Sequence, residues 1–197
     1  MKKNLLVALR MTLATLLLTG LVYPLLITAV AQTAFPWRAN GSVVSEGGRV
    51  VGSELIGQGF RSPAYFQSRP SAAGADGYDA ANSAGSNLGP TSQKLRDRVA
   101  ADVARLRAEN PQAPPEVPAD LATTSASGFD PHLSPAAARW QVARVAAARG
   151  VPAGDVQALV DARTEPRTLG LLGEPRVNVL LLNLDVDRRL GRPAGKS

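Results

Sequence analysis

The sequence has 197 residues, with 22 Lys or Arg against 16 Asp or Glu, and it contains no cysteine. The missing thiols exclude disulfides, thiolate metal sites and cysteine nucleophiles together. Of the net charge of +6, Lys2, Lys3 and Arg10 contribute +3 at the start, which leaves +3 for everything beyond. That remainder is spread along the chain without a Lys/Arg cluster, so nucleic acid binding has no support.

Residues Met11 to Phe35 carry no charge, and this stretch predicts a transmembrane helix. Because the basic residues precede it, residues 1–10 are expected in the cytoplasm and residues 36–197 in one extracytoplasmic domain. Trp37 stands where the helix would leave the bilayer. A cleaved signal peptide is the alternative, since Ala29-Val30-Ala31 imitates a cleavage site, but the apolar stretch exceeds the usual signal length of roughly 7–15 residues.

Hydroxyl-bearing residues recur along this helix at spacings of three, four and four, which places them on one face. Small and hydroxylated residues at such spacings suit contact with another membrane helix. The other interpretation is that the threonine hydroxyls bond only to their own backbone. The predicted partner-contact residues are Thr12, Thr15, Thr19 and Tyr23.

Beyond the helix, Val43-Val44, Arg49 to Val51 and Tyr65-Phe66 are β-favouring pieces separated by turn residues. Residues 69–90 lack periodic apolar positions and predict a loop. A helix is expected from Thr91 or Ser92 to Asn110, with Leu95, Val99, Val103 and Leu106 forming an apolar stripe.

Residues 121–133 predict a second loop, and Ser134-Pro135 has the pattern of an N-cap followed by proline at the first helical position. That helix is expected to end at Gly150, and residues 152–162 predict another. Val177 to Leu184 is almost entirely apolar, which predicts a buried strand. The expected fold class is therefore α+β: a single N-terminal transmembrane helix followed by one mixed domain.

Three places invite a chemical interpretation. Asp130, His132 and Ser134 combine the residue types of a hydrolase triad, but residues two apart on an extended loop cannot easily face one another as a triad requires. Turn and helix-cap roles are favoured for them. Residues 85–92 lead into a helix N-terminus that could hold an anion, although capping is favoured. Asp185 and Asp187 would share a face at the end of the last predicted strand.

Several strings resemble the C subunit of the Kdp-type potassium-transporting ATPase. They are Gly52 to Gln58, Tyr65 to Ser71, Ser83 to Pro90, Thr123 to Pro135 and Gly173 to Leu184, together with Tyr23-Pro24 in the opening helix. The resemblance covers nearly the whole chain. It implies a non-catalytic accessory subunit of an ATP-driven, high-affinity potassium uptake pump in the bacterial inner membrane.

The same resemblance implies three partners: a potassium-conducting subunit, a P-type ATPase subunit and a small membrane subunit. It also implies a catalytic chaperone role that raises the ATP affinity of the ATPase subunit, with Gln58 as a possible ATP contact and no firmly bound cofactor. The predicted topology conflicts with that contact, because it places Gln58 outside, where ATP is not supplied. The alternative functions are an extracytoplasmic hydrolase or binding protein, either anchored or released by signal cleavage.

Overall fold

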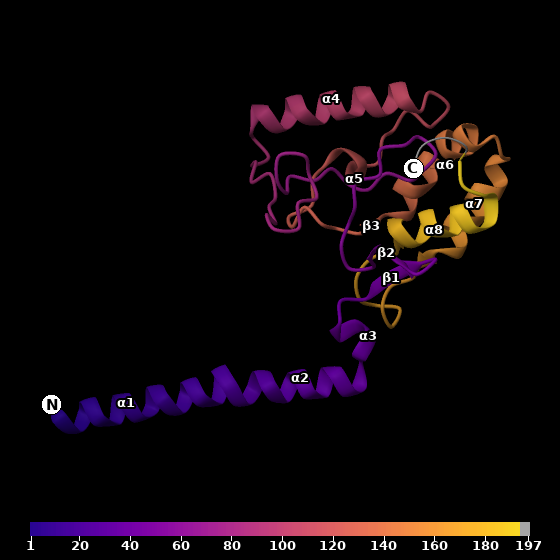
Figure 1. Ribbon diagram of the computed structural model, residues 1–197. Coiled ribbons are helices and arrows are strands. Elements are labelled where there is room, and N and C mark those ends of the chain that lie inside the picture. The colour runs from indigo at the N-terminus through magenta and orange to yellow at the C-terminus, as the bar shows by residue number, and fades with distance from the viewer. Residues whose placement is uncertain (194–197) are drawn as a thin grey trace. The chain divides into compact units, whose positions relative to one another are not determined.

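The computed structural model describes residues 1–193, and the chain divides into two compact units, unit 1 up to Val51 and unit 2 from Gly52 on. Its elements mix helices and short strands, so the predicted α+β class is confirmed (Figure 1). Unit 1 contains α1 (Lys2–Leu17), the π-helix η1 (Leu18–Val22), α2 (Tyr23–Ala34), α3 (Pro36–Ala39) and β1 (Val43–Glu46), and β2 (Arg49–Ser53) runs on from unit 1 into unit 2. Unit 2 contains α4 (Gln93–Glu109), α5 (Ala119–Ala122), β3 (His132–Leu133), α6 (Pro135–Arg149), α7 (Ala153–Ala162), β4 (Thr164–Glu165), β5 (Arg176–Asn178) and α8 (Val179–Leu190).

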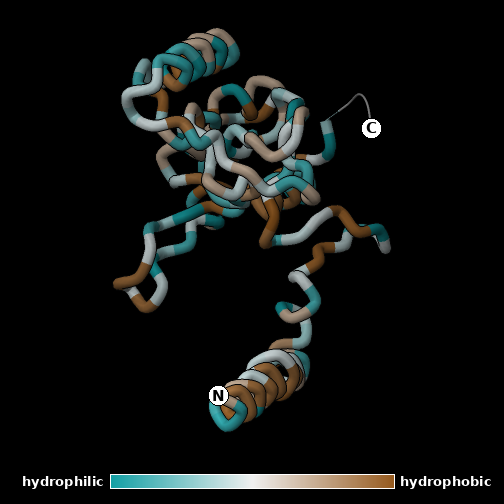
Figure 2. Tube along the Cα trace, turned by 90° about the vertical axis from the view of Figure 1, so that its left-hand side faces the viewer, coloured by the Kyte–Doolittle hydropathy of each residue, from teal (hydrophilic) through white to brown (hydrophobic). Residues whose placement is uncertain are grey.

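Unit 1 is dominated by one continuous helix from Lys2 to Ala34, with a mean hydropathy of 2.1 over its most apolar window. It is long and apolar enough to cross a membrane, as predicted, and the brown colour of its trace in Figure 2 marks its hydrophobic residues. It starts earlier than Met11 because the Lys, Leu, Val and Ala residues before that point also favour or tolerate helix. None of its residues is buried within the chain.

A π-helical turn interrupts this helix between Leu18 and Val22. The Tyr23 N–H donates to the Leu18 carbonyl, five residues back instead of four. Its cause is Pro24, which has no N–H to offer the Gly20 carbonyl and whose ring would press against that carbonyl in a regular α-helix. The wider turn relieves the clash, and such insertions are frequent at functional positions of helices.

The predicted strands after the helix are confirmed as a hairpin of β1 and β2. Its two-residue turn is Gly47-Gly48, whose φ angles are +57° and +80°. Positive φ at both central residues is what a type I′ hairpin turn requires, and glycine adopts it without steric cost.

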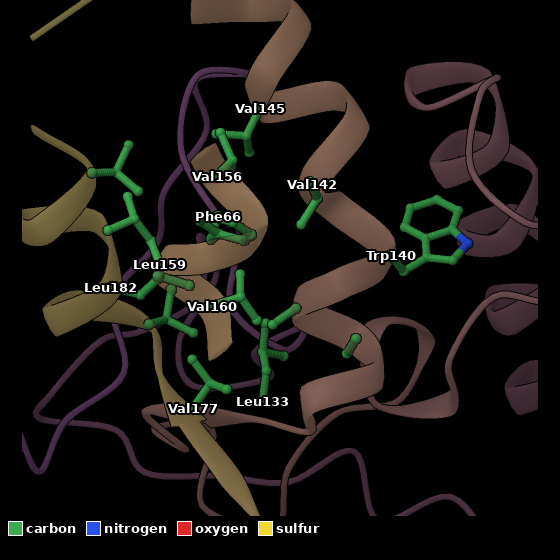
Figure 3. Close-up of a cluster of buried hydrophobic side chains, with 14 of the residues drawn as sticks. Phe66, Leu133, Trp140, Val142, Val145, Val156, Leu159, Val160, Val177 and Leu182 are labelled. Atoms are coloured by element: carbon green, nitrogen blue, oxygen red, sulfur yellow. The ribbon is translucent and has the colours of Figure 1, made fainter. Parts of the chain in front are cut away.

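The predicted helices of unit 2 form with the predicted caps. The Ser92 hydroxyl accepts the N–H of Leu95 at the start of α4, and the Ser134 hydroxyl accepts the N–H of Ala137 at the start of α6. Gly150 ends α6 in the left-handed conformation. Helices α6, α7 and α8 surround one hydrophobic core (Figure 3). Its labelled members are Phe66, Leu133, Trp140, Val142, Val145, Val156, Leu159, Val160, Val177 and Leu182.

The prediction of a strand from Val177 to Leu184 is wrong beyond Asn178. Strand β5 pairs with β3 on one side and β4 on the other, both antiparallel, and ends at Asn178. The Asn178 side chain accepts the N–H of Leu181 at 3.1 Å and so caps α8. A short run that is apolar at nearly every position suits a buried helix as well as a buried strand, so periodicity could not distinguish them.

The expectation that Asp185 and Asp187 share a face at the end of that strand is therefore also wrong. On a helix, residues two apart point in different directions, and each carboxylate binds its own arginine. Asp185 pairs with Arg163 and Asp187 with Arg149.

Candidate functional site

The segment from Pro63 to Gln67 starts with a turn at Pro63-Ala64 and belongs to no described sheet, so the predicted strand at Tyr65-Phe66 is wrong. We call it the clamped segment, because side chains hydrogen-bond its backbone. Asn183 on α8 accepts the N–H of Phe66 at 2.8 Å and donates to the Phe66 carbonyl at 2.9 Å. One side-chain amide thus replaces a neighbouring strand, and Phe66 is fully buried.

Gln141 on α6 repeats this arrangement one residue later. It accepts the N–H of Gln67 at 2.8 Å and donates to the Gln67 carbonyl at 3.1 Å. Arg144, one turn further along α6, donates to Gln141 at 2.7 Å and to the carbonyls of Pro63 and Tyr65. Buried polar groups are stable only when paired, and here each one pairs with backbone that would otherwise be unsatisfied.

Charged side chains fix the part of the clamped segment near α8. Arg149 donates to the Ala64 carbonyl and to Asp187 at 2.7 Å each, and its guanidinium lies 4.8 Å from the centre of the Tyr65 ring. The Tyr65 hydroxyl donates to Asp187 at 2.9 Å. Burial, and then the hydrogen bond to the Asp187 carboxylate, raise the Tyr65 pKa, so the phenol stays protonated and donates.

The loops that carry the sequence motifs pack against one another through glycines. The Gly57 N–H donates to the Phe129 carbonyl at 2.7 Å, and a Cβ on Gly57 would lie 2.6 Å from the Asp130 carbonyl oxygen. A Cβ on Gly85 would lie 2.9 Å from the Ala126 carbonyl oxygen. Since no side chain fits there, glycine is required for these close backbone approaches.

A partly exposed ion pair also joins two motifs. Arg69 donates to Asp130 at 2.9 Å and to the Thr124 carbonyl at 3.3 Å. The Tyr78 hydroxyl in turn donates to the Arg69 carbonyl. Four of the five motif strings therefore meet around residues 123–130, and the fifth contributes Asn178 and Asn183 to the same body.

Asp130, His132 and Ser134 have the turn and cap roles that the sequence favoured. Asp130 accepts the backbone N–H of His132 at 3.0 Å, and the Ser134 hydroxyl caps α6. The His132 Nδ1 lies 3.8 Å from Asp130, too far for a hydrogen bond. Burial, and then the charge of Arg176, lower the His132 pKa, so the imidazole is neutral near pH 7. The arrangement is not a catalytic triad.

Gln58 is half-buried, and its side chain lies against the backbone of Gly52: a Cβ on Gly52 would be 2.2 Å from the Gln58 Nε2. Its carbonyl accepts the Ser68 hydroxyl at 3.0 Å. A cleft of about 410 Å³ begins at the next residue, lined by Gly59, Phe60 and Tyr78 among others, but Gln58 does not line it. Within residues 1–193, no group of three or more His, Asp or Glu side chains could hold a metal ion.

On the membrane helix, Thr12, Thr15 and Thr19 line one shallow groove, whereas Tyr23 is not among its lining residues. The Thr19 hydroxyl donates to the Thr15 carbonyl at 2.8 Å, so for this residue the backbone interpretation holds. All four predicted contact residues are exposed. The groove leaves room for a neighbouring helix to approach closely.

Sequence reasoning missed the residues that organise unit 2, namely Gln141, Arg144, Arg149 and Asn183. A signal was present. Gln141 and Arg144 interrupt an Ala- and Val-rich helix, and Asn183 interrupts the apolar run after Val177. A polar residue at a position that must be buried indicates a specific hydrogen-bond partner.

Comparison with known proteins shows the family of the chain. Residues 5–188 match the family model described as the K+-transporting ATPase, c chain. The chain is 66% identical over 187 residues to the potassium-transporting ATPase KdpC subunit of Myxococcus xanthus, covering 94% of this chain and 88% of that one. The subunit of the same name from Koribacter versatilis is 58% identical, with 95% of each chain covered. The chain therefore belongs to the KdpC family, the accessory rather than the catalytic subunit of the K+-transporting ATPase complex.

Proposed function

We propose that this chain stabilises a potassium uptake pump in the bacterial inner membrane and regulates it from the extracytoplasmic side. The observation that carries the proposal is the structural role of the family motifs. Their polar side chains form hydrogen bonds that hold unit 2 together, such as those of Asn183 and Asn178. A body built this way suits a rigid contact surface, not a reaction centre.

The proposed partners are the potassium-conducting subunit, the P-type ATPase subunit and the small membrane subunit. The membrane helix has no buried residue and carries the groove of Thr12, Thr15 and Thr19, which suits a helix of one of these partners. Purification of the tagged full chain from membranes in mild detergent tests this. Recovery of all three partners is expected, and recovery of the chain alone refutes the proposed function.

The proposed orientation has the N-terminus in the cytoplasm and unit 2 outside, because Lys2, Lys3 and Arg10 precede the span. The chain has no native cysteine, so single cysteines report cleanly. In intact cells, a membrane-impermeant thiol reagent is expected to label Ser86→Cys and not Lys3→Cys. The reverse labelling would place unit 2 inside.

The catalytic chaperone role, in which the subunit raises ATP affinity, then acts at a distance. By binding one conformation of its partners more tightly, the chain would shift the pump toward that conformation and so change the nucleotide affinity. Direct ATP contact through Gln58 is a separate prediction. Measuring the ATP affinity of the assembled pump with Gln58→Ala distinguishes an effect at a distance from direct contact. An unchanged ATP affinity supports the effect at a distance, and a lower ATP affinity with assembly intact supports direct contact.

A further inference from the structure

The loop between β4 and β5 exposes three leucines to solvent. Leu169, Leu171 and Leu172 are 88%, 80% and 63% exposed. We call residues 167–174 the leucine loop, and its apolar tip stands out in Figure 2. A contiguous apolar surface of this kind on a soluble body usually marks a site of interaction.

Hydrogen bonds and an ion pair hold the leucine loop together. Thr168 and Leu172 exchange backbone hydrogen bonds of 2.9 Å each, and the Leu171 N–H also donates to the Thr168 carbonyl. Arg167 binds both oxygens of Glu174 at 2.7 and 2.6 Å across the base of the loop. A loop held in one conformation loses little entropy when it binds.

Leu169 has a φ of +56°, the left-handed conformation that leucine avoids. Two glycines at positive φ, Gly170 and Gly173, complete the tight bend. The fold thus maintains an unfavourable backbone conformation in order to present an apolar side chain to the outside. Strain of this type is concentrated at binding sites.

Two classes of surface could cover such a tip: a lipid bilayer or an apolar pocket in a protein. Lipid binding by a loop draws on unpaired basic residues and interfacial aromatic rings. The segment 165–176 has neither, since Arg167 pairs with Glu174, Arg176 pairs with Glu165 at 3.0 Å, and no aromatic residue is present. The paired arginines, the lack of aromatic residues and the hydrogen bonds that hold the loop together favour a protein pocket over a bilayer.

We propose that the leucine loop docks into an apolar pocket on the exposed surface of another subunit of the same pump. This inference rests on the proposed function, because it presupposes the complex. The three leucines would supply the buried centre of the contact, and the Arg167–Glu174 pair would lie at its polar rim. The loop would then hold unit 2 on its partner, independently of the membrane helix.

The test places a single cysteine at Leu171 in the assembled pump and labels it with a benzophenone maleimide. Irradiation is expected to produce an adduct with one protein subunit, visible as a band of higher mass. The matched control is Ala101→Cys on the exposed face of α4, which is expected to give no comparable band. Attachment only to lipid or detergent, with the complex intact, would overturn the proposal while leaving the proposed function standing.

A second variant tests whether the leucines contribute binding energy. Leu169→Asp in the Leu171→Cys background is expected to reduce the adduct yield by about tenfold or more, as for a central contact residue. Leu169→Met keeps the apolar character and should retain the yield. Because Leu169 is exposed and aspartate tolerates its positive φ better than leucine, neither variant should unfold at a lower denaturant concentration than the parent. An unchanged yield with Leu169→Asp would show that the loop touches its neighbour without docking.

Discussion

Replacing Asn183 with leucine tests whether side-chain amides hold the clamped segment. Leucine fills about the same space but provides no polar atoms, so the buried N–H and carbonyl of Phe66 would both lose their partners. Each unsatisfied buried group costs about 1–3 kcal/mol. For two such groups we expect Asn183→Leu to lower the free energy of unfolding by about 2–6 kcal/mol.

The measurement is urea unfolding of the full chain in mild detergent, followed by the fluorescence of Trp140, which is buried in unit 2. A Trp37→Phe background removes the other tryptophan signal. The matched control is Gln93→Leu, because the Gln93 side chain donates to Asp97 at 2.7 Å on the exposed surface of α4. That control should change stability by no more than about 0.5 kcal/mol. If Asn183→Leu behaves like the control, the amide is not what holds the clamped segment.

Replacing Thr15 and Thr19 with leucine should fill the groove on the membrane helix and weaken pump assembly by about 1–2 kcal/mol, measured by co-purification; normal assembly would refute this contact face. His132→Gln should leave potassium transport near normal, whereas a loss of about a hundredfold or more would indicate acid–base catalysis. Because the folded pKa of His132 is lowered, unfolding should become easier as the pH falls below about 6.5, and His132→Gln should flatten that dependence in urea titrations at several pH values. Gly57→Ala should destabilise unit 2, since its Cβ would meet backbone, whereas Gly154→Ala, with open space on α7, should be neutral or stabilising by up to about 1 kcal/mol in thermal unfolding.

The sequence by itself determined the helices and helix ends whose signals lie within one segment of the chain. The membrane helix follows from an uncharged stretch, the starts of α4 and α6 from Ser92 and Ser134, and the end of α6 from Gly150. Each of these signals lies within the segment that it specifies, so no knowledge of the rest of the chain was needed. The turn role of Asp130 and the cap role of Ser134 also followed from spacing alone.

Tertiary structure alone decided which elements were buried together and what the polar core residues do. Residues 179–184 are helical because Asn178 caps them and α8 packs on α7, a choice that an apolar run does not encode by itself. Phe66 is buried outside the described strands because Asn183, 117 positions away in the sequence, bonds its backbone. Such pairings connect distant residues, so their energy depends on the folded arrangement and leaves no local pattern in the sequence.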